Sequence, residues 1–237
     1  IMSARRFLRL SAAAAAVALL VLAPHGASAQ QIPSPAEQRA YTGLQQAAWR
    51  GDVQALDRLL AQGKADLEMR DANGRTPLQI ATYAKQRDAI RRLAHAGAKL
   101  DAMDVQRYDA VTIASVADDP QTLALLLSLG ASAKQTTSPY DGTALIAAAH
   151  LGHVEVVRQL IAAGAPLDHV NNLHWTALIE SIVLGDGGTR HQQTLALLVE
   201  AGANLQLADR DGRTPLQLAR SRGYAAMVAK LEAAGAK

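Results

Sequence analysis

The residues best suited to chemistry are a pair of histidines. His150 and His153 are three residues apart, near one face of a predicted helical turn, and paired imidazoles can hold a metal ion. A third ligand is not evident, although His169, His174 or His191 could approach if the fold allowed it. A small-ligand or metal-binding module that uses these histidines and the 185–191 insertion is therefore kept as the alternative hypothesis for function.

A glycine-rich stretch is the second candidate. Gly185–Arg190 reads GDGGTR, and a glycine run ahead of Thr and Arg could cradle an anion at a helix start. The stretch lacks the GxxxxGK[ST] pattern of a nucleotide-binding loop. It also reads as a tolerated surface insertion, because longer loops add little entropy cost. A partner contact in 185–191 is the more plausible functional interpretation.

No catalytic constellation is visible. The chain has no cysteine to act as a nucleophile, and it has no GxSxG or HExxH pattern. Ser115 and Ser181 occupy positions that hold small packing residues elsewhere, and Asp118 and Asp119 precede Pro120 as a turn and a helix start. Nucleophilic catalysis needs a base and an oxyanion site beside the nucleophile. We therefore expect a non-enzymatic protein without a cofactor.

The first 29 residues have the pattern of a secretory signal peptide. Basic residues (Arg5, Arg6 and Arg9) come before the apolar run Leu10–Ala23, and Ala27–Ala29 supplies a small-x-small site. The apolar run of about 14 residues is shorter than the roughly 20 needed to span a bilayer. The pattern predicts cleavage after Ala29, a periplasmic protein without stable membrane association, and secretion as an alternative.

The predicted leader also accounts for the basic balance of the chain. Without its three Arg residues, the 24 Lys and Arg residues fall to 21, which equals the 21 Asp and Glu residues. A mature chain with no net charge offers no global electrostatic attraction for nucleic acid. We expect the partner to be another protein, and not a nucleic acid.

Two landmarks repeat along the rest of the chain. Helix-opening triplets begin at residues 76, 109, 143, 176 and 214, at intervals of 33, 34, 33 and 38 residues. Closing glycines recur at Gly63, Gly97, Gly130, Gly164, Gly202 and Gly235. A fixed period of this length indicates stacked structural repeats, each of which buries its apolar face against its neighbours.

The clearest repeat is residues 141–171. Thr143 caps a short helix, and Gly152 ends it. Apolar residues at Val154, Val157 and Leu160 then give a second amphipathic helix. This stretch resembles one ankyrin repeat almost from end to end.

The resemblance implies an all-α solenoid of about six ankyrin-type helix-turn-helix repeats with short hairpin tips. We assign a flexible lead-in at 30–37, an N-terminal capping repeat at 38–72, repeats at 73–105, 106–138 (degenerate), 139–171 and 172–210 (with an insertion), and a C-terminal capping repeat at 211–237. The resemblance also implies a structural role for His153, because ankyrin repeats usually carry Asn or His at this position, where the side chain ties the loop between the two helices.

Ankyrin-like arrays bind partners through the tips and the concave face of the inner helices, so the resemblance implies candidate partner-binding residues. These are Arg75, Met103, Tyr108, Tyr140, Asn172, His174, Trp175 and Arg213. We interpret Tyr108, Tyr140 and Trp175 as a row of aromatic rings at homologous, exposed tip positions; packing of each ring over the neighbouring hairpin is the alternative. His174 stands where other tips carry Gly142 or Gly212, so we expect a left-handed backbone there at a cost of about 1 kcal/mol.

Overall fold

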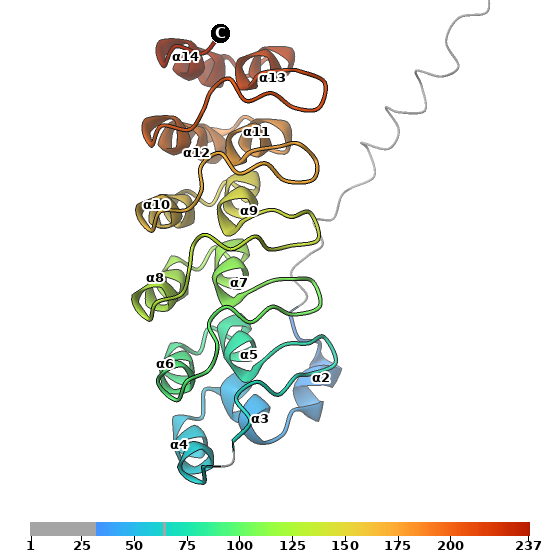
Figure 1. Ribbon diagram of the computed structural model, residues 1–237, viewed down its shortest axis with the longest axis vertical. Coiled ribbons are helices and arrows are strands. Elements are labelled where there is room, and N and C mark those ends of the chain that lie inside the picture. The colour runs from blue at the N-terminus through green and yellow to red at the C-terminus, as the bar shows by residue number, and fades with distance from the viewer. Residues whose placement is uncertain (1–31, 64) are drawn as a thin grey trace, which may run out of the picture. The chain divides into compact units, whose positions relative to one another are not determined.

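The computed structural model describes residues 32–63 and 65–237, and within them Pro33–Lys237 form one unit. The predicted signal peptide lies outside the described residues. The unit is a stack of helix pairs in chain order (Figure 1). The pairs are α3 (Gly43–Arg50) with α4 (Val53–Ala61), α5 (Pro77–Tyr83) with α6 (Arg87–His95), α7 (Ala110–Val116) with α8 (Pro120–Ser128), α9 (Ala144–Leu151) with α10 (Val154–Ala162), α11 (Ala177–Val183) with α12 (Thr189–Glu200), and α13 (Pro215–Ser221) with α14 (Ala225–Ala233).

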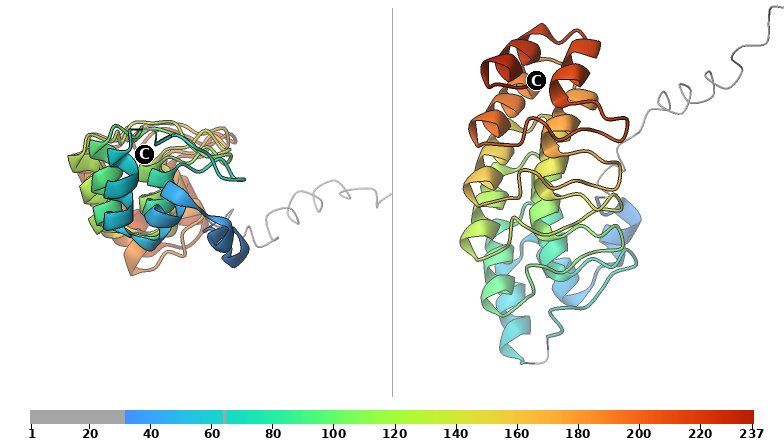
Figure 2. Two further views of the ribbon diagram at one scale, coloured as in Figure 1. Left: turned by 90° about the horizontal axis from the view of Figure 1, so that it is seen from below. Right: turned by 45° about the horizontal axis from the view of Figure 1, so that its top comes forward.

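The helices lie in two layers. Odd-numbered helices from α3 to α13 form the inner layer and even-numbered helices from α4 to α14 the outer layer, and the connecting tips project to one side of the inner layer (Figures 1 and 2). Each inner helix packs against the next inner helix and against its own outer partner. The described residues hold no strand beyond an isolated bridge between Thr137 and Gly142. The predicted all-α solenoid is confirmed.

Local capping sets where the inner helices begin. The Thr143 hydroxyl accepts a hydrogen bond from the Ile146 N–H at 3.3 Å, which satisfies an orphan donor in the first turn of α9. Asp109 and Thr176 cap α7 and α11 in the same way. At α5 and α13 a full capping box forms, with Pro at the first helical position. The helix-opening triplets are therefore structural.

The closing glycines end the outer helices by a Schellman-type arrangement. Gly164 has φ +78°, and its N–H donates to the Ile161 carbonyl at 2.9 Å. The next N–H, that of Ala165, donates to the Leu160 carbonyl at 3.0 Å. Ala165 is itself buried, which explains why a small residue follows the glycine.

Repeated apolar positions build the core. One leucine of each outer helix from α6 to α14 and one Leu or Val of each inner helix from α5 to α13 are at most 1% exposed: Leu93, Leu126, Leu160, Leu198 and Leu231, and Leu78, Val111, Leu145, Leu178 and Leu216. Each such burial contributes about 1.5–3 kcal/mol relative to exposure. Because these side chains fill the space between successive pairs, every pair needs its neighbours.

The lead-in differs from the expectation. Residues 30–37 were predicted to be flexible, but helix α2 (Pro35–Ala40) begins inside them. Ser34 and Glu37 form a capping box at the start of α2, in which each side chain accepts a hydrogen bond from the backbone N–H of the other residue. Pro35 occupies the first helical position. The sequence SPAE carries this signal, although the residues around it have no hydrophobic period.

Candidate functional site

The tips are five short turns, residues 71–75, 104–108, 137–142, 171–175 and 209–213, each of which precedes an inner helix. In the first tip the Asp71 N–H donates to the Arg75 carbonyl at 3.1 Å. One carboxylate oxygen of Asp71 accepts from the N–H groups of Asn73 and Arg75, both at 2.9 Å. Asp104, Asn171 and Asp209 close their tips in the same way, and the Ser138 hydroxyl does so at 3.3 Å in the third tip.

These closing residues were missed from the sequence. They share a polar side chain four residues before the last position of each tip, a spacing that could have revealed them. A side-chain acceptor that satisfies two backbone donors holds a turn in one conformation. The tips are therefore ordered elements and not loose loops.

Neighbouring tips are also bonded to one another. Backbone hydrogen bonds join the first four tips in order: Val105 N to Asn73 O at 3.0 Å, Ser138 N to Arg107 O at 3.0 Å, and Asn172 N to Tyr140 O at 2.9 Å. Arginine side chains add further links, from Arg70 to Met103 O at 2.6 Å, from Arg107 to Asp141 at 2.6 Å, and from Arg210 to Asn172 O at 3.1 Å. The row of tips thus forms a single continuous surface.

The fourth position of a tip takes the left-handed conformation. His174 has φ +64°, as predicted, and Arg107 has φ +60°. The equivalent residue of the third tip is Asp141, with φ +52°. Asp141 and His174 each lie two residues before the N-cap of the next inner helix, Thr143 or Thr176. The predicted alignment of His174 with Gly142 was therefore wrong by one residue.

The aromatic row is the main correction. Tyr108 is only 8% exposed, in a cluster with Tyr83 and Ile113. Trp175 occupies the same tip position and is half-buried against the main core. Tyr140 stands two places earlier in its tip and is 47% exposed. Tyr108 and Trp175 share the last tip position and are covered by the core, whereas Tyr140 occupies another position and is exposed, so the three rings do not form the predicted row.

The remaining candidates divide between structural and accessible residues. Arg75 is 1% exposed: it donates to Asp71 at 2.7 Å and lies 5.7 Å from the centre of the Tyr83 ring. Met103 is half-buried. Arg213 is half-exposed but pairs with Asp209 and Asp211 at 2.7 and 2.9 Å. Arg75 is therefore part of the framework of its tip.

Among the exposed tip residues, Val105, Tyr140, Asn172 and His174 lie on three consecutive tips that are bonded to one another. Val105 is 66% exposed, and Tyr140, Asn172 and His174 are also exposed. Asn172 bonds Tyr140 through its backbone and the Pro139 carbonyl through its side chain at 3.2 Å. We call Val105, Tyr140, Asn172 and His174 the tip edge.

The histidines do not form a ligand set. His153 Nδ1 lies 2.9 Å from the Ser115 carbonyl of α7, so this side chain connects the start of α10 to the preceding repeat. His191 uses Nδ1 toward Asp186 and Nε2 toward the His150 carbonyl, both at 2.8 Å. Within residues 32–63 and 65–237, no group of three or more His, Cys, Asp or Glu side chains could hold a metal ion.

The 185–191 insertion is packed against its neighbours. Arg190 donates to the Gly152 carbonyl at 2.9 Å and pairs with Asp118 at 2.6 Å. The Tyr224 hydroxyl donates to the Gly185 carbonyl at 3.0 Å. The insertion also lengthens α12 to 12 residues, against nine in α10 and α14. Since the Arg190 guanidinium is already engaged, the geometry does not favour the anion site.

Glu180 is a buried acid that sequence reasoning missed. It is 5% exposed on α11, where the equivalent position of α5 and α7 holds isoleucine. Burial raises the pKa of its carboxyl to about 8, against the opposing hydrogen bond that Asn171 donates at 2.7 Å. His150 Nδ1 lies 3.6 Å from the other carboxyl oxygen, and burial lowers the pKa of that imidazole.

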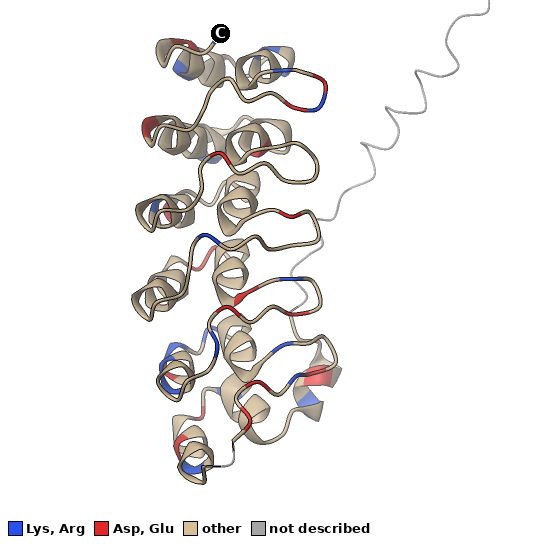
Figure 3. Ribbon diagram, in the orientation of Figure 1, with Lys and Arg blue, Asp and Glu red and all other residues tan. Residues whose placement is uncertain are grey.

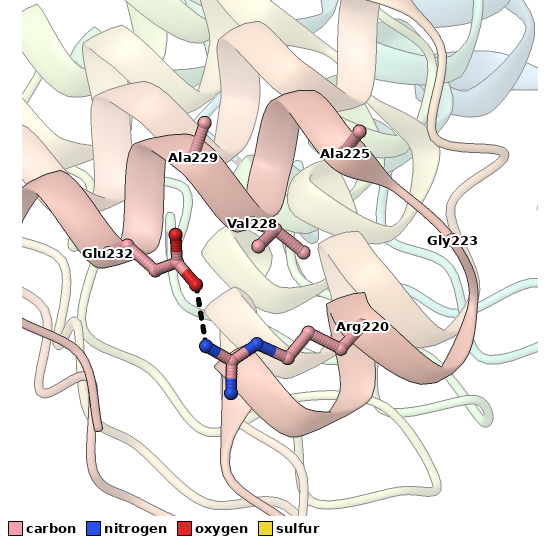
Figure 4. Close-up of a pocket in the computed structure, with 6 residues that line it drawn as sticks. All are labelled: Arg220, Gly223, Ala225, Val228, Ala229 and Glu232. Carbon is pink, nitrogen blue, oxygen red and sulfur yellow. Dashed lines mark hydrogen bonds and ion pairs between the residues drawn. The ribbon is translucent and has the colours of Figure 1, made fainter.

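Surface charge is mixed. Basic and acidic residues are interspersed over the tips and the outer helices, whereas the inner helices α5, α7 and α9 carry neither, as Figure 3 shows for the described residues. An open hollow lies in the last helix pair, with the Arg220–Glu232 ion pair across it at 2.5 Å (Figure 4). Its lining is otherwise small and apolar: Gly223, Ala225, Val228 and Ala229. The two charged side chains of the lining are paired with each other.

The described part of the chain, residues 32–63 and 65–237, contains no helix with the length and apolar composition needed to cross a bilayer.

The stacked helix pairs and their tips define an interaction solenoid. The family description "Ankyrin repeats (3 copies)" matches residues 10–104 and 111–209, and the chain belongs to the ankyrin-repeat family. It is 34% identical over 191 residues to the ankyrin repeat protein YahD of Escherichia coli (strain K12), which covers 80% of this chain and 94% of YahD.

Solved structures agree with the fold. An ankyrin repeat domain from Acinetobacter baumannii AYE has a TM-score of 0.77 and 47% identity, covering 82% of this chain and 98% of that one. One chain in the structure of the endopeptidase Bd0816 in complex with the immunity protein Bd3460, from Bdellovibrio bacteriovorus, has the same fold. It is 23% identical to this chain with a TM-score of 0.64, and the match covers 81% of this chain and 98% of that one. Ankyrin repeats generally mediate protein–protein interactions and are not enzymes.

Proposed function

We propose that this protein is an exported, non-enzymatic ankyrin-repeat protein that binds another protein, in the periplasm, through its tips and the concave inner-helix face. The observation that carries the proposal is the tip edge. Its exposed apolar and hydrogen-bonding side chains lie on turns that are bonded into one row. A surface that is already ordered loses little entropy when it binds.

The chemistry of the tip edge favours a protein partner. Tyr140 and Val105 offer apolar area, while Asn172 and His174 offer donors and acceptors beside it. Interfaces typically combine such apolar anchors with a polar surround.

Export is supported by the pattern of the leader. Residues 1–29 carry a basic start, an apolar run and Ala27–Ala29. Mass spectrometry of the intact protein from a periplasmic fraction tests this directly, with the expected chain beginning at Gln30. Recovery of the uncleaved chain with the membranes would contradict the proposal.

Partner binding is tested by crosslinking capture from a periplasmic extract. The bait is the chain from residue 30 to 237, compared with a Tyr140→Ala, His174→Ala variant. Leu184→Ser is the matched control, because Leu184 is also exposed but follows the far end of α11 from its tip. We expect one protein to be captured by wild type and by the control and lost in the tip variant. Equal capture by all three would place the contact elsewhere.

A further inference from the structure

Helix α2 lies on the tip side of the array, beside α3 and α5, in both Figure 1 and the right view of Figure 2. None of its residues is buried. Pro33 ahead of it and Tyr41 after it are buried, and the Tyr41 hydroxyl donates to Asp71 at 2.8 Å. The helix is thus a lightly held segment with an anchor at each end.

One carboxylate fastens α2 to the array. Glu37 Oε1 accepts from both the Arg75 guanidinium and the Asn73 side-chain amide in the first tip. Its other oxygen accepts from the Ser34 N–H at 2.8 Å. Burial alone would raise the pKa of Glu37, but the hydrogen bonds from Ser34 and the charge of Arg75 outweigh it, and the pKa is lowered. The carboxylate is therefore held ionised where it touches the tip.

Arg75 and Asn73, which bind Glu37, also make contacts that do not involve α2. Arg75 is 1% exposed, donates through Nε to Asp71 at 2.7 Å, and lies over the Tyr83 ring. When α2 leaves, Asp71 remains beside the guanidinium, so the buried charge keeps a counter-charge. Asn73 stays fixed because its backbone carbonyl accepts from Val105. This arrangement is a preformed carboxylate-binding site.

We propose that Arg75 and Asn73 form a recognition site for an acidic peptide segment of a partner protein, and that α2 occupies this site through Glu37 as a displaceable internal ligand. The inference rests on the proposed function, since it names the chemistry of the partner. A guanidinium and an amide that converge on one carboxylate discriminate an acid from its amide, which cannot pair with the charge.

The internal ligand would set a threshold for binding. A tethered segment competes at an effective concentration on the order of millimolar, so a partner must present its acid with additional contacts, such as those of the tip edge. The contact should weaken with salt, because Glu37 is partly exposed.

A peptide assay tests the site without the unknown partner. The probe is a fluorescein-labelled peptide of residues 32–42, IPSPAEQRAYT, and its control carries Glu37→Gln. Both are titrated by fluorescence polarisation into the chain 30–237, as wild type and as Glu37→Gln. We expect the Glu37→Gln chain to bind the Glu peptide at least about tenfold tighter than wild type does, and at least about tenfold tighter than it binds the Gln peptide.

Two further measurements keep the proposal open to refutation. Asn73→Ala, added to the Glu37→Gln chain, should weaken the Glu peptide several-fold without unfolding the array, since the Asn73 backbone contacts remain. Sedimentation should show a monomer for wild type; a dimer that dissociates in Glu37→Gln would make a second copy the occupant. That dimer, the absence of peptide binding, or equal binding of Glu and Gln peptides would each overturn the proposal.

The outcomes separate this site from the proposed function. If the peptide binds as expected and no periplasmic protein is retained by the tip edge, the carboxylate site stands and the function proposed above fails. If a partner is captured and its retention is the same in Glu37→Gln and wild type, the function stands and the internal-ligand role fails.

Discussion

At the scale of single residues, burial decides which polar and aromatic groups of the tips are available. Arg75 and Tyr108 occupy the last position of successive tips, and both contact Tyr83 of α5, which follows the tip of Arg75 and precedes that of Tyr108. Tyr140, two places earlier in its tip, points away from the helices and is exposed. In these tips the position of a residue, more than its type, decides whether its side chain is covered by the inner helices.

Tyr108→Ala should destabilise the protein, whereas Tyr140→Ala should not. Removing the buried ring leaves a cavity beside Tyr83 and Ile113, at a cost of about 3 kcal/mol; removing the exposed ring should change stability by less than about 0.5 kcal/mol. Urea unfolding followed by circular dichroism compares the two. A Tyr108→Ala chain as stable as wild type would mean that the ring is dispensable to packing.

Glu180 should make stability fall as the pH rises. Its pKa is about 8 when folded and near 4.5 when unfolded, so the folded chain binds the extra proton between these values. The contribution of Glu180 to the free energy of unfolding should therefore be largest below about pH 4.5. It should decline between about pH 4.5 and pH 8 and level off above about pH 8. The full effect is on the order of a few kcal/mol.

The control for this prediction is Glu180→Gln, which keeps the hydrogen bond with Asn171 possible and removes the titration. His150, whose pKa is lowered, acts in the opposite direction, because its protonation below about pH 6.5 opposes folding. The difference in melting temperature between Glu180→Gln and wild type should widen from pH 5 to pH 8. A difference that does not change with pH would show that Glu180 ionises freely.

At the scale of elements, the helix boundaries could be predicted because their causes are local. The cap at Thr143 acts three residues ahead, and Gly164 closes its helix within four residues. Burial of Arg75 and Tyr108 could not be predicted in this way. Arg75 bonds to Glu37, which lies 38 residues earlier, and Tyr108 packs on Tyr83 in the preceding repeat. Contacts across repeats have no signature inside one repeat.

The insertion in the fifth repeat should be sensitive to substitution. Gly187 has φ +71°, and a Cβ there would lie 2.5 Å from the Tyr224 ring. Gly223 has nearly the same φ, +70°, with no atom within 4 Å of such a Cβ. Both Ala variants should lose about 1 kcal/mol from backbone strain, and Gly187→Ala should lose about 1–3 kcal/mol more from overpacking.

Thermal unfolding of the two glycine variants measures that difference, because the strain is common to both. Equal melting temperatures would indicate that the insertion moves freely away from Tyr224, which would restore the interpretation of a loose surface loop.

At the scale of the molecule, stability is carried from pair to pair. Each helix pair contacts only its neighbours in the stack, so the free energy of the array is close to a sum of pair and interface contributions. An inner pair has two interfaces and a terminal pair has one. Matched substitutions at equivalent core positions should therefore act differently along the array.

Leu160 in α10 and Leu231 in α14 are such a matched couple, since both are fully buried at equivalent places. Replacing either by Ala removes about 2–5 kcal/mol of local packing. Leu231→Ala should raise amide exchange only in α13 and α14, because the pairs before them keep their interfaces.

Leu160→Ala weakens interfaces on both sides, so exchange should rise from α7 to α12 and the main urea midpoint should fall. Peptide-level exchange by mass spectrometry distinguishes the two patterns. If amide exchange rose uniformly along the chain in both variants, the array would unfold as one cooperative unit. Helix α2 and the tips could then not detach unless the core unfolded too.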